Sequence, residues 1–560
     1  MVFMSVQVGR VVLSRDKPAS ADSFWCTIEN QSYIPEVGSY LVCEASFSGQ
    51  ACRLLCVIED VEYSADVTSA AVYYGAMMPP SPPPTSPVTI KMAKVRVVAS
   101  EMEVYTPPEA GSLMRTLNQG DAELLARTIP QRNRILIGFA RGSFIPVYMH
   151  SEYLLGEQAA HANISGKTGL ATKTSYALFL AYNILAWAKA NDENVKVVML
   201  NVKGGDLMRL HKSSEKWENI FNNVGKWSKM AGISSNDVKG LLEGWKAALD
   251  KIDPCEFNRN VKYFTYQGDS FDPFNDKYTN VVYFSYGLAD ITTEELIAAL
   301  YRPDEEIQER QINAIYTYMS EAGELRGQLS FDLLIEDLKK YSTYTPDKMS
   351  QQVKAKLFVK LIDWHYLTMG ALFRRVTGFL ARSTKIVKRD RPNGNPIKFD
   401  SLDTNKINVI QIYGLSDQEQ RLVVNALLRE IREKLEGSKE RVKVVVFVDE
   451  LNKYAPKRYS PIKEQLLEIA SRGRYIGLSL VGAQQFASDI DSEIYGNTSL
   501  KVVGQSDDSE VSSEIYRFLG ELRKRATRLR KGQLIIHHPM LFAPIIVEFP
   551  PPPHVISLVA

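Results

Sequence analysis

The sequence contains little cysteine and little histidine for its length. Five cysteines and seven histidines occur in 560 residues, with no C-x-x-C pair and no zinc-ligand spacing. Four of the cysteines fall between Cys26 and Cys56, in segments rich in strand-forming residues. We therefore expect reduced thiols, mostly buried in strands.

An excess of either charge and a long apolar run are also missing. The 67 Lys and Arg residues nearly balance 65 Asp and Glu residues, for a formal net charge of +2. Any nucleic-acid contact must then come from local basic clusters. No apolar run approaches the roughly 18 residues of a membrane helix, and the N-terminus lacks a signal-peptide pattern. We expect a cytoplasmic protein without membrane contact.

The N-terminal residues 1–110 contain short runs of Val, Ile, Tyr and Cys separated by turn residues, which favours strands closing into a small β-barrel. The run MMPPSPPPTSPV, residues 77–88, interrupts them. Because proline lacks an amide donor, this run is a loop or an edge excursion. We interpret it as a solvated loop, with a site for a proline-reading partner as the alternative.

Beyond residue 110 the pattern predicts an α/β core interrupted by helices, because apolar strands alternate with helical periods as in a parallel sheet covered on both faces. The predicted order is a first core part with a phosphate loop at 111–206, a helical insertion at 207–260, core strands at 261–291, a helical insertion with a basic loop at 292–400, a second core part at 401–520 and a C-terminal segment at 521–560.

The stretch ISGKTGLATKTSYALFL, residues 164–180, nearly matches a phosphate-binding loop. Gly166 and Gly169 can adopt positive φ, but Thr172 stands where a second glycine is usual, and Gly166 lies one position too early. A loop longer by one residue accounts for both departures. The predicted cofactor-binding set is Gly166, Gly169, Thr172, Lys173, Thr174 and Ser175.

Within that set, Lys173 would reach the β and γ phosphates of ATP, and the Thr174 hydroxyl would bind Mg²⁺. A strand, a turn rich in Gly and Thr, and a helix beginning near Lys173 follow in the order that a phosphate cradle requires. The alternative is an ordinary strand-to-helix turn with solvated lysines.

A second candidate element is KVVVFVDELNKYAP, where a β-branched and aromatic run ends in Asp449 and Glu450. At the carboxyl edge of a parallel sheet, Asp449 would hold Mg²⁺ and Glu450 would polarise the attacking water. Taken alone, such a pair could equally serve solubility or start a helix. The two elements together favour a nucleotide site.

A further strand ends in Gln484 and Gln485, whose amides suit sensing of a γ-phosphate or orientation of water. Just before this strand, Arg472 and Arg474 lie on a glycine turn. One of them could reach a neighbouring subunit's γ-phosphate as an arginine finger. The alternative is that both cap a helix C-terminus.

Together these segments resemble the HerA branch of the HerA/FtsK superfamily of P-loop ATPases. The resemblance covers nearly the whole chain and includes ILIGFARGSFIPVYMHSE, HANISGKTG, LNVKGGDL, VVVFVDELNKYAP, RGRYIGLSLVGAQQ and KGQLIIHHPMLFAPIIVEFPPPP. The Thr172 departure indicates a divergent subgroup, since Lys173, Thr174, Asp449 and Glu450 all remain.

The resemblance implies a RecA-like ATPase core behind a barrel, a homo-hexameric ring using ATP and Mg²⁺ between subunits, and translocation of double-stranded DNA through its pore. It also implies a nuclease or other effector docked on the barrel, with the segment from 521 bracing the neighbour's nucleotide site. In that role, any contact made by Arg523 or Arg525 would be structural or nucleotide-facing.

Basic residues cluster from Arg374 to Lys398, where Asp390 is the one acid. If each subunit of a ring carried this cluster, the copies together could bind DNA phosphates. Its candidate DNA-binding residues are Arg382, Lys385, Lys388, Arg389 and Arg391, around RDRPNGNP, which we expect to be a flexible turn projecting into a pore. The alternative is a solvated hairpin tip. The second run, RKRATRLRK at 523–531, favours an exposed helix face or a subunit contact.

Three functions fit these patterns. The leading hypothesis is a DNA-translocating ATPase acting in DNA end processing or anti-phage defence. The second is a ring scaffold that positions effector subunits, with nucleotide supporting assembly. A conjugation or secretion ATPase of the same superfamily is a minor third hypothesis.

Overall fold

The computed structural model describes residues 5–65, 89–103, 105–126, 129–156, 159–167, 173–212, 221, 224–231, 233–250, 252–301, 309–326, 329–343, 366–438, 442–457 and 461–551. The proline-rich run at 77–88 lies outside these residues, as do Gly169 and Thr172 of the expected phosphate loop. Among the described helices, none combines the length and apolarity that crossing a bilayer requires.

The N-terminal strands form the expected barrel. It is closed and antiparallel in the order β1-β2-β5-β4-β3-β6. Its strands are β1 Gln7–Val12, β2 Ser23–Thr27, β3 Tyr40–Phe47, β4 Gln50–Ala65, β5 Thr89–Ser100 and β6 Leu113–Thr116. Because β6 pairs with both β1 and β3, the barrel closes after residue 110. All five cysteines of the chain are free and buried, four of them within the barrel strands, as expected.

The core is a 12-stranded sheet in the order β12-β11-β13-β10-β14-β15-β9-β16-β17-β18-β7-β8. Its strands are β7 Arg134–Ala140, β8 Pro146–His150, β9 Ala160–Ser165, β10 Val195–Asn201, β11 Lys262–Thr265, β12 Val281–Tyr283, β13 Ile407–Gln411, β14 Lys443–Asp449, β15 Leu478–Gln484, β16 Thr498–Val503, β17 Gln533–His537 and β18 Ile545–Glu548. From β12 to β16 every pairing is parallel, whereas β16 to β8 pair antiparallel. The α/β fold class is thus confirmed, with an antiparallel extension that the sequence pattern did not indicate.

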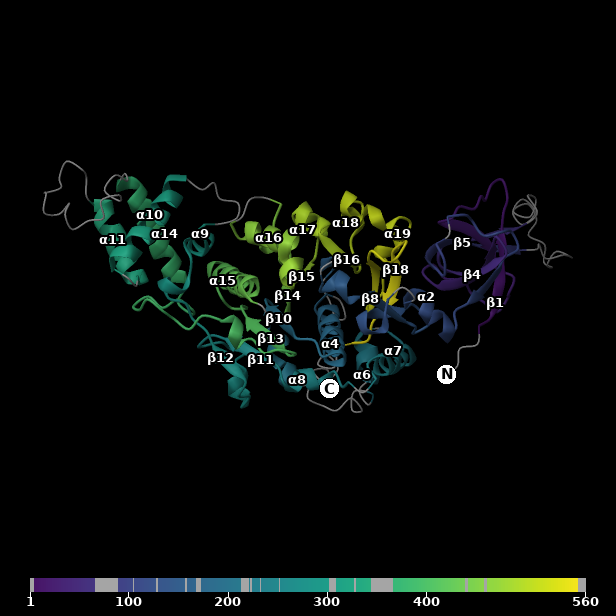
Figure 1. The fold of residues 1–560 in the computed structure, drawn as a ribbon, viewed down its shortest axis with the longest axis horizontal. Coiled ribbons are helices and arrows are strands. Elements are labelled where there is room, and N and C mark those ends of the chain that lie inside the picture. The colour runs from purple at the N-terminus through teal and green to yellow at the C-terminus, as the bar shows by residue number, and fades with distance from the viewer. Residues whose placement is uncertain are drawn as a thin grey trace, which may run out of the picture.

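Helices cover both faces of the sheet, as the continuous apolar strands predict. Along β14, Val445 and Phe447 face one apolar core while Val444, Val446 and Val448 face the other, because successive side chains point to opposite faces. The first face carries α4 Lys173–Asn191, α6 Val224–Ala231, α7 Ser235–Ala248 and α8 Cys255–Arg259; the second carries α9 Thr293–Leu300, α15 Asp417–Gly437, α16 Pro461–Ile476 and α17 Ser492–Gly496 (Figure 1).

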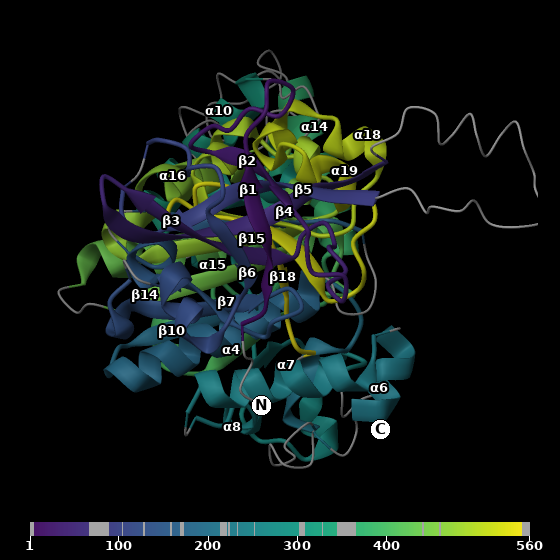
Figure 2. The same cartoon turned by 90° about the vertical axis from the view of Figure 1, so that its right-hand side faces the viewer.

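The remaining helices lie toward the two ends of the molecule. Helices α10 Glu309–Arg326, α11 Phe331–Thr343 and α14 Tyr366–Arg382 form an end opposite the barrel, while α2 Ala122–Ala126, α18 Asp508–Val511 and α19 Leu522–Ala526 lie toward the barrel side (Figures 1 and 2). The short α3 Ser151–Leu154 packs against β8, β9 and β16. The barrel is joined to the core by the Tyr40 hydroxyl, which donates to the Ile546 carbonyl at 2.6 Å, and by Arg141, which donates to the Val37 carbonyl and pairs with Glu36.

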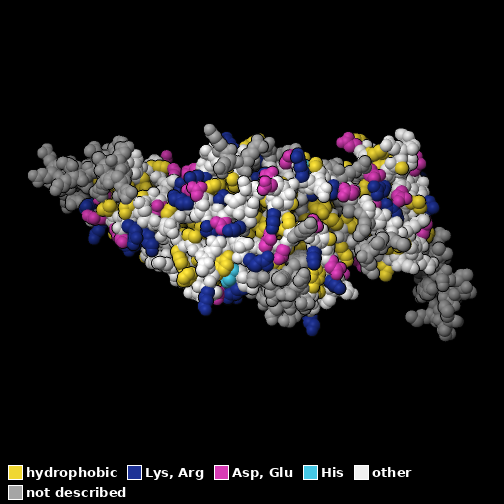
Figure 3. All heavy atoms as spheres, turned by 60° about the horizontal axis from the view of Figure 1, so that its bottom comes forward, with side chains coloured by type: hydrophobic (Ala, Val, Ile, Leu, Met, Phe, Trp, Pro, Cys, Tyr) yellow, Lys and Arg dark blue, Asp and Glu magenta, His cyan; other side chains and the backbone are white. Residues whose placement is uncertain are grey.

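The surface reflects the near-neutral charge of the chain. On the face shown in Figure 3, basic and acidic side chains are interspersed among polar and apolar ones. An interspersed surface favours solubility without creating a large field of one sign. Any polyanion site on this face must therefore be a local arrangement of a few side chains.

The first residues of β9 contain a buried titratable group. His161 is 2% exposed, and its Nδ1 accepts the Leu480 backbone N–H at 2.9 Å. Burial lowers the pKa of His161 from 6.5 to about 4, because the imidazolium would lose its hydration. The folded protein therefore holds this ring neutral in a range where the unfolded chain is protonated.

We predict that His161 makes the fold sensitive to acid. Since the unfolded state binds the extra proton between pH 6.5 and about 4, stability is fully present above pH 6.5 and falls as the pH drops through that window. At pH 5 the loss attributable to this group is about 2 kcal/mol. In His161→Gln, the fall in Tm between pH 7 and pH 5, measured by differential scanning fluorimetry, should be smaller than in the wild type. Equal falls would contradict the prediction.

Candidate functional site

The carboxyl ends of four adjacent parallel strands meet at one edge of the sheet. In the sheet these strands lie in the order β10, β14, β15 and β9. Register pairs Leu200 with Val448, Val448 with Gly482, and Gln484 with Ser165. Residues that immediately follow these strands are therefore neighbours, although they come from distant parts of the chain. We call this the carboxyl edge.

The turn after β9 is held by backbone contacts. Gly166 has φ +139°, and its N–H donates to the Gln485 carbonyl at 3.3 Å. A Cβ on Gly166 would lie 3.0 Å from the Gly504 Cα, so the position requires glycine on both counts. Lys167 donates its N–H to the Gln505 carbonyl and pairs with Asp507 at 2.6 Å. The start of the candidate cradle thus lies against the turn after β16.

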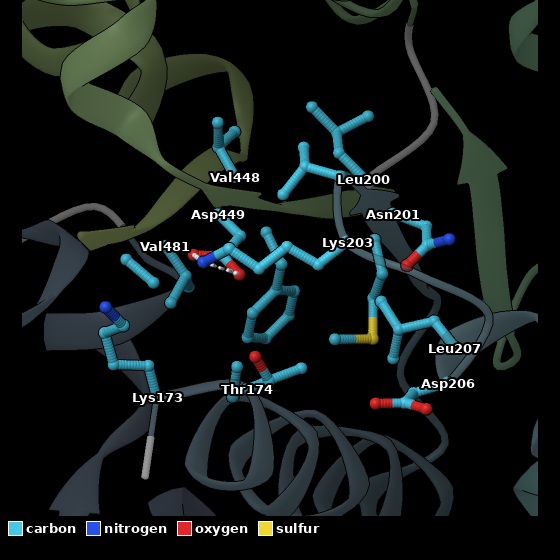
Figure 4. Close-up of a pocket in the computed structure, with 15 residues that line it drawn as sticks. Lys173, Thr174, Leu200, Asn201, Lys203, Asp206, Leu207, Val448, Asp449 and Val481 are labelled. Atoms are coloured by element: carbon cyan, nitrogen blue, oxygen red, sulfur yellow. Dashed lines mark hydrogen bonds and ion pairs between the residues drawn. The ribbon is translucent and has the colours of Figure 1, made fainter. Parts of the chain in front are cut away.

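A cavity of about 200 Å³ opens at the carboxyl edge (Figure 4). Lys173 and Thr174 rise from the first turn of α4 toward Asp449, which closes the opposite side. Ser175, the third predicted residue of this turn, is half-buried and does not line the cavity. A helix N-terminus beside a lysine and a hydroxyl provides N–H donors and positive charge for an anion.

The Lys173 ammonium is in an unusual environment for a cation. The residue is 4% exposed, and its pKa is lowered to about 8, first by burial and then by the nearby Lys203. The carboxylates of Asp449 and Glu450 act in the opposite direction but do not cancel these effects. A buried cation of this kind is stabilised by an incoming anion, which suits a phosphate-binding role.

The acid pair has a defined backbone geometry. Asp449 ends β14, and its Oδ1 accepts the N–H of Glu450 at 2.9 Å. Glu450 has φ 57°, a left-handed conformation that costs a non-glycine residue about 1 kcal/mol or more. Its side chain is 45% exposed, whereas that of Asp449 is 14% exposed. The turn thus keeps Asp449 in the wall of the cavity and leaves Glu450 accessible to water.

Lys203 is a site residue that sequence reasoning missed. It follows β10, and its Nζ lies 3.3 Å from Asp449 Oδ2 and 3.3 Å from Glu450 Oε1. Figure 4 shows its side chain extended across the cavity to Asp449. The available signal was the apolar strand VKVVMLN running into KGGD, a second strand that ends in a charged glycine turn.

Asn201, on the same strand, is a second site residue that sequence reasoning missed. It ends β10, lines the cavity, and donates to Gln411 Oε1 at 2.7 Å. Gln411 in turn donates to Asp269, which also accepts from Thr265. This buried polar network joins the cavity wall to β11 and β13, so the strands beyond β10 contribute to the orientation of Asn201.

The structure separates the two predicted glutamines. Gln484 is fully buried and donates to Asn163 Oδ1 on β9 at 2.7 Å. Gln485 is exposed at the end of β15, between the turn after β9 and the end of β14. Of the two amides, only that of Gln485 is exposed, although Gln485 is not among the residues that line the cavity.

The predicted arginine pair lies away from the cavity of the same chain. Arg472 and Arg474 are in the last turns of α16, which leads into the first residue of β15, Leu478. The cavity is at the other end of that strand. Arg472 is exposed, and Arg474 stacks on the exposed Tyr475, with its guanidinium 4.7 Å from the ring centre. Neither arginine can act on the cavity of its own chain.

The basic segment is more constrained than expected. Residues 386–395 pair with 285–289 through backbone hydrogen bonds that include Tyr286 N–H to the Ile386 carbonyl and Ala289 N–H to the Pro392 carbonyl. Both sides of RDRPNGNP are thus held against a neighbouring segment rather than forming a free flexible turn, and the projection of this turn into a pore stays a prediction. Its candidate DNA-binding residues remain on the surface, with Lys388 half-buried.

Several of those residues already have partners. Arg389 pairs with Asp332 at 3.0 Å, Arg382 donates to Gln418 at 2.9 Å, and Lys385 donates to the Gly414 carbonyl. Arg391 has only its neighbour Asp390, at 3.8 Å, as an ion-pair partner among the described residues. Arg391 and half-buried Lys388 have the least engaged side chains of this set among the described residues, and Arg391 is the more exposed of the two.

Comparison with known proteins gives no family assignment. No protein-family model and no curated protein matches the chain. The bacterial conjugative coupling protein TrwBdeltaN70 matches with a TM-score of 0.44 at 10% identity, over 76% of this chain and 92% of that one. VirB4 of Thermoanaerobacter pseudethanolicus matches with a TM-score of 0.44 at 12% identity, over 75% and 97%. The genome packaging NTPase B204 of Sulfolobus turreted icosahedral virus 2 has a TM-score of 0.21 at 15% identity, over 26% and 68%.

We predict that the turn after β9 tolerates no side chain at Gly166. Gly166→Ala should lower Tm by several degrees, because alanine at φ +139° is strained and its Cβ meets Gly504. Gly496→Ala in α17 is the matched control, since a Cβ there meets open space. Thermal unfolding of both variants checks the prediction, and equal Tm values would contradict it.

Proposed function

We propose that the protein is a Mg²⁺-dependent ATPase whose catalytic site is the cavity at the carboxyl edge. One observation supports this most strongly: buried Lys173 and half-buried Thr174, at the start of a 19-residue helix, face Asp449 across a single cavity, and Glu450 follows Asp449 directly. A triphosphate with its cation requires this combination of helix N–H groups, ammonium, hydroxyl and carboxylate.

The residues present suit Mg²⁺ and a polyphosphate. Thr174 Oγ1 and an Asp449 oxygen would hold the cation, since hard oxygen ligands suit Mg²⁺ and phosphates usually complete its shell. No group of three or more His, Cys, Asp or Glu side chains forms a metal cluster within the described ranges, so a site completed by substrate is the consistent arrangement. Bound there, Mg²⁺ would neutralise charge that develops on the phosphates.

In the proposed reaction, a water oxygen bonds to the γ-phosphorus as the bond from that phosphorus to the β–γ bridging oxygen breaks. Glu450 takes the proton of the attacking water, and its exposed carboxylate beside the cavity suits this task. Lys173 neutralises the β and γ oxygens, and Gln485 orients the water or senses the γ-phosphate. Gly166 and the loop to Thr172 supply backbone contacts to the phosphates.

We further propose a homo-hexameric, HerA-type ring that moves double-stranded DNA in the cytoplasm. Arg472 or Arg474 lies at the opposite end of β15 from its own cavity, so an arginine finger role requires a second copy of the chain. The basic segment would contact DNA phosphates, chiefly through Arg391. The barrel, at one end of the molecule, would dock a nuclease or other effector in DNA end processing or anti-phage defence (Figure 1).

A ring scaffold is the second candidate function. The observation that favours it is the pairing of Lys203 with both acids, which engages the charges that hydrolysis requires. A motor should hydrolyse ATP faster with long duplex DNA, whereas a scaffold should assemble with its effector regardless of Lys173→Ala.

We predict that Glu450→Gln abolishes turnover while preserving ATP binding. Loss of the base should lower kcat by about 100-fold or more, because a glutamine cannot accept the proton. Lys173→Ala should instead weaken ATP binding itself. Phosphate release and fluorescent-nucleotide titration measure the two effects, with Glu464→Gln, exposed on α16, as the control. Unchanged hydrolysis in Glu450→Gln would remove Glu450 from the proposed role.

We predict that Arg391→Glu weakens binding of duplex DNA and lowers its salt dependence. Each lost phosphate contact should reduce the slope of log K against log salt by about 1 per subunit engaged. Lys524→Glu, in the second basic run on α19, is a control of equal charge change. Fluorescence anisotropy at several salt concentrations tests this, and equal weakening in both variants would show that only overall charge matters.

A further inference from the structure

Lys203 pairs with both acids of the proposed catalytic site, Asp449, which would hold the divalent cation, and Glu450, the proposed base. Its Nζ is 3.3 Å from an oxygen of Asp449 and 3.3 Å from an oxygen of Glu450. Within the cavity of Figure 4, this is the ion pair that spans the two walls formed by β10 and β14. The ammonium thus neutralises the carboxylates that Mg²⁺ would otherwise attract.

The backbone after β10 defines this placement. Gly204 has φ +51°, a conformation that favours glycine, and a Cβ on Gly205 would lie 2.4 Å from the Phe271 ring, so the turn requires glycine at 205. The turn presents the Lys203 stem to the cavity, while 43% of the side chain remains exposed. A half-exposed lysine has room to change rotamer, unlike Lys173, which is enclosed in α4 and the sheet.

The charges in and beside the cavity nearly cancel. Lys173, Lys203, Asp206 and Asp449 line it and Glu450 lies beside Asp449, so two lysines stand against three acids for a formal sum of −1. A divalent cation added alone would leave an excess of positive charge and would meet the Lys203 ammonium at the same carboxylate oxygens. Like charges at such a separation repel strongly in a partly buried site. Metal and Lys203 therefore exclude one another.

We propose that Lys203 is a built-in competitor of the divalent cation. It pairs with Asp449 and Glu450 in the empty site, leaves them when Mg²⁺ binds, and turns to the phosphate oxygens of the nucleotide that arrives with the metal. This proposal rests on the proposed ATPase function of the cavity. A nucleoside triphosphate carries more negative charge than one Mg²⁺ cancels, so it can accept the displaced ammonium.

This arrangement regulates how the site is loaded. Metal alone must displace Lys203 without offering it another partner, and so binds weakly. When metal arrives with a triphosphate, the metal takes the acids and the phosphate oxygens accept the displaced Lys203, so the pair binds well. A diphosphate lacks the terminal phosphate, and Lys203 then returns to the acids more readily. The lysine thereby favours the triphosphate over the product.

The first test measures metal binding without nucleotide. Mn²⁺, which also prefers oxygen ligands, is titrated into the full-length protein and the free ion is followed by electron paramagnetic resonance. If Lys203 holds the acids about nine-tenths of the time, Lys203→Met should bind Mn²⁺ about tenfold more tightly than the wild type. Lys203→Gln provides a second variant should the methionine disturb folding, and thermal unfolding verifies both.

The matched control is Lys212→Met. Lys212 has the same exposed fraction, 43%, and pairs with Asp276 at 2.7 Å, but it does not line the cavity. Its removal should leave Mn²⁺ affinity at the wild-type value. Equal Mn²⁺ affinities in the wild type, Lys203→Met and Lys203→Gln would overturn the competitor role.

The second test compares fluorescent ATP and ADP in the presence of Mg²⁺. Lys203→Met should lose several-fold of the wild-type preference for ATP over ADP, because the proposed contact to the terminal phosphate is gone. An unchanged preference would overturn the transfer of Lys203 to phosphate. Failure of the wild type to bind ATP at all would instead overturn the proposed function, and the Mn²⁺ result would still decide whether Lys203 competes with metal.

Discussion

The pairing of four parallel strands is the constraint on which the candidate site depends. Strand β14 is hydrogen-bonded to β10 on one side and to β15 on the other. This pairing places Asp449 and Glu450 beside the turn that carries Lys203 and one strand away from β9. Close packing supports the arrangement: a Cβ on Gly482 would lie 2.3 Å from Leu451, so glycine makes room for the residue after the acid pair. Displacing β14 by one residue would turn Asp449 to the other face.

Electrostatic balance explains how a charged cavity persists inside a largely apolar core. Lys173 is buried at a cost that lowers its pKa to about 8, and the opposing acids offset part of that cost. The acids in turn pair with Lys203. Two strands and one helix thus supply charges that no single segment could carry in isolation, and the same charges are the ones that a metal–polyphosphate complex would rearrange.

The carboxyl edge belongs to the core rather than to the barrel or the outer helices. The barrel lies at one end of the molecule and helices α10, α11 and α14 at the other (Figure 1). The two arginines on α16 lie at the opposite end of β15 from their own cavity. The basic segment is anchored to residues 285–289, so its charges are presented from a fixed platform.

The sequence alone determined the strand and helix types near the site. The run of β-branched and aromatic residues VVVFV specified β14, and the apolar period after the glycines specified a helix that does begin at Lys173. Tertiary structure alone decided that Lys203 meets the acids, that Gln484 turns inward to Asn163, and that β16 to β8 extend the sheet antiparallel. Local patterns report neighbours within a few residues, whereas these contacts depend on strand pairing across hundreds of residues, which periodicity does not encode.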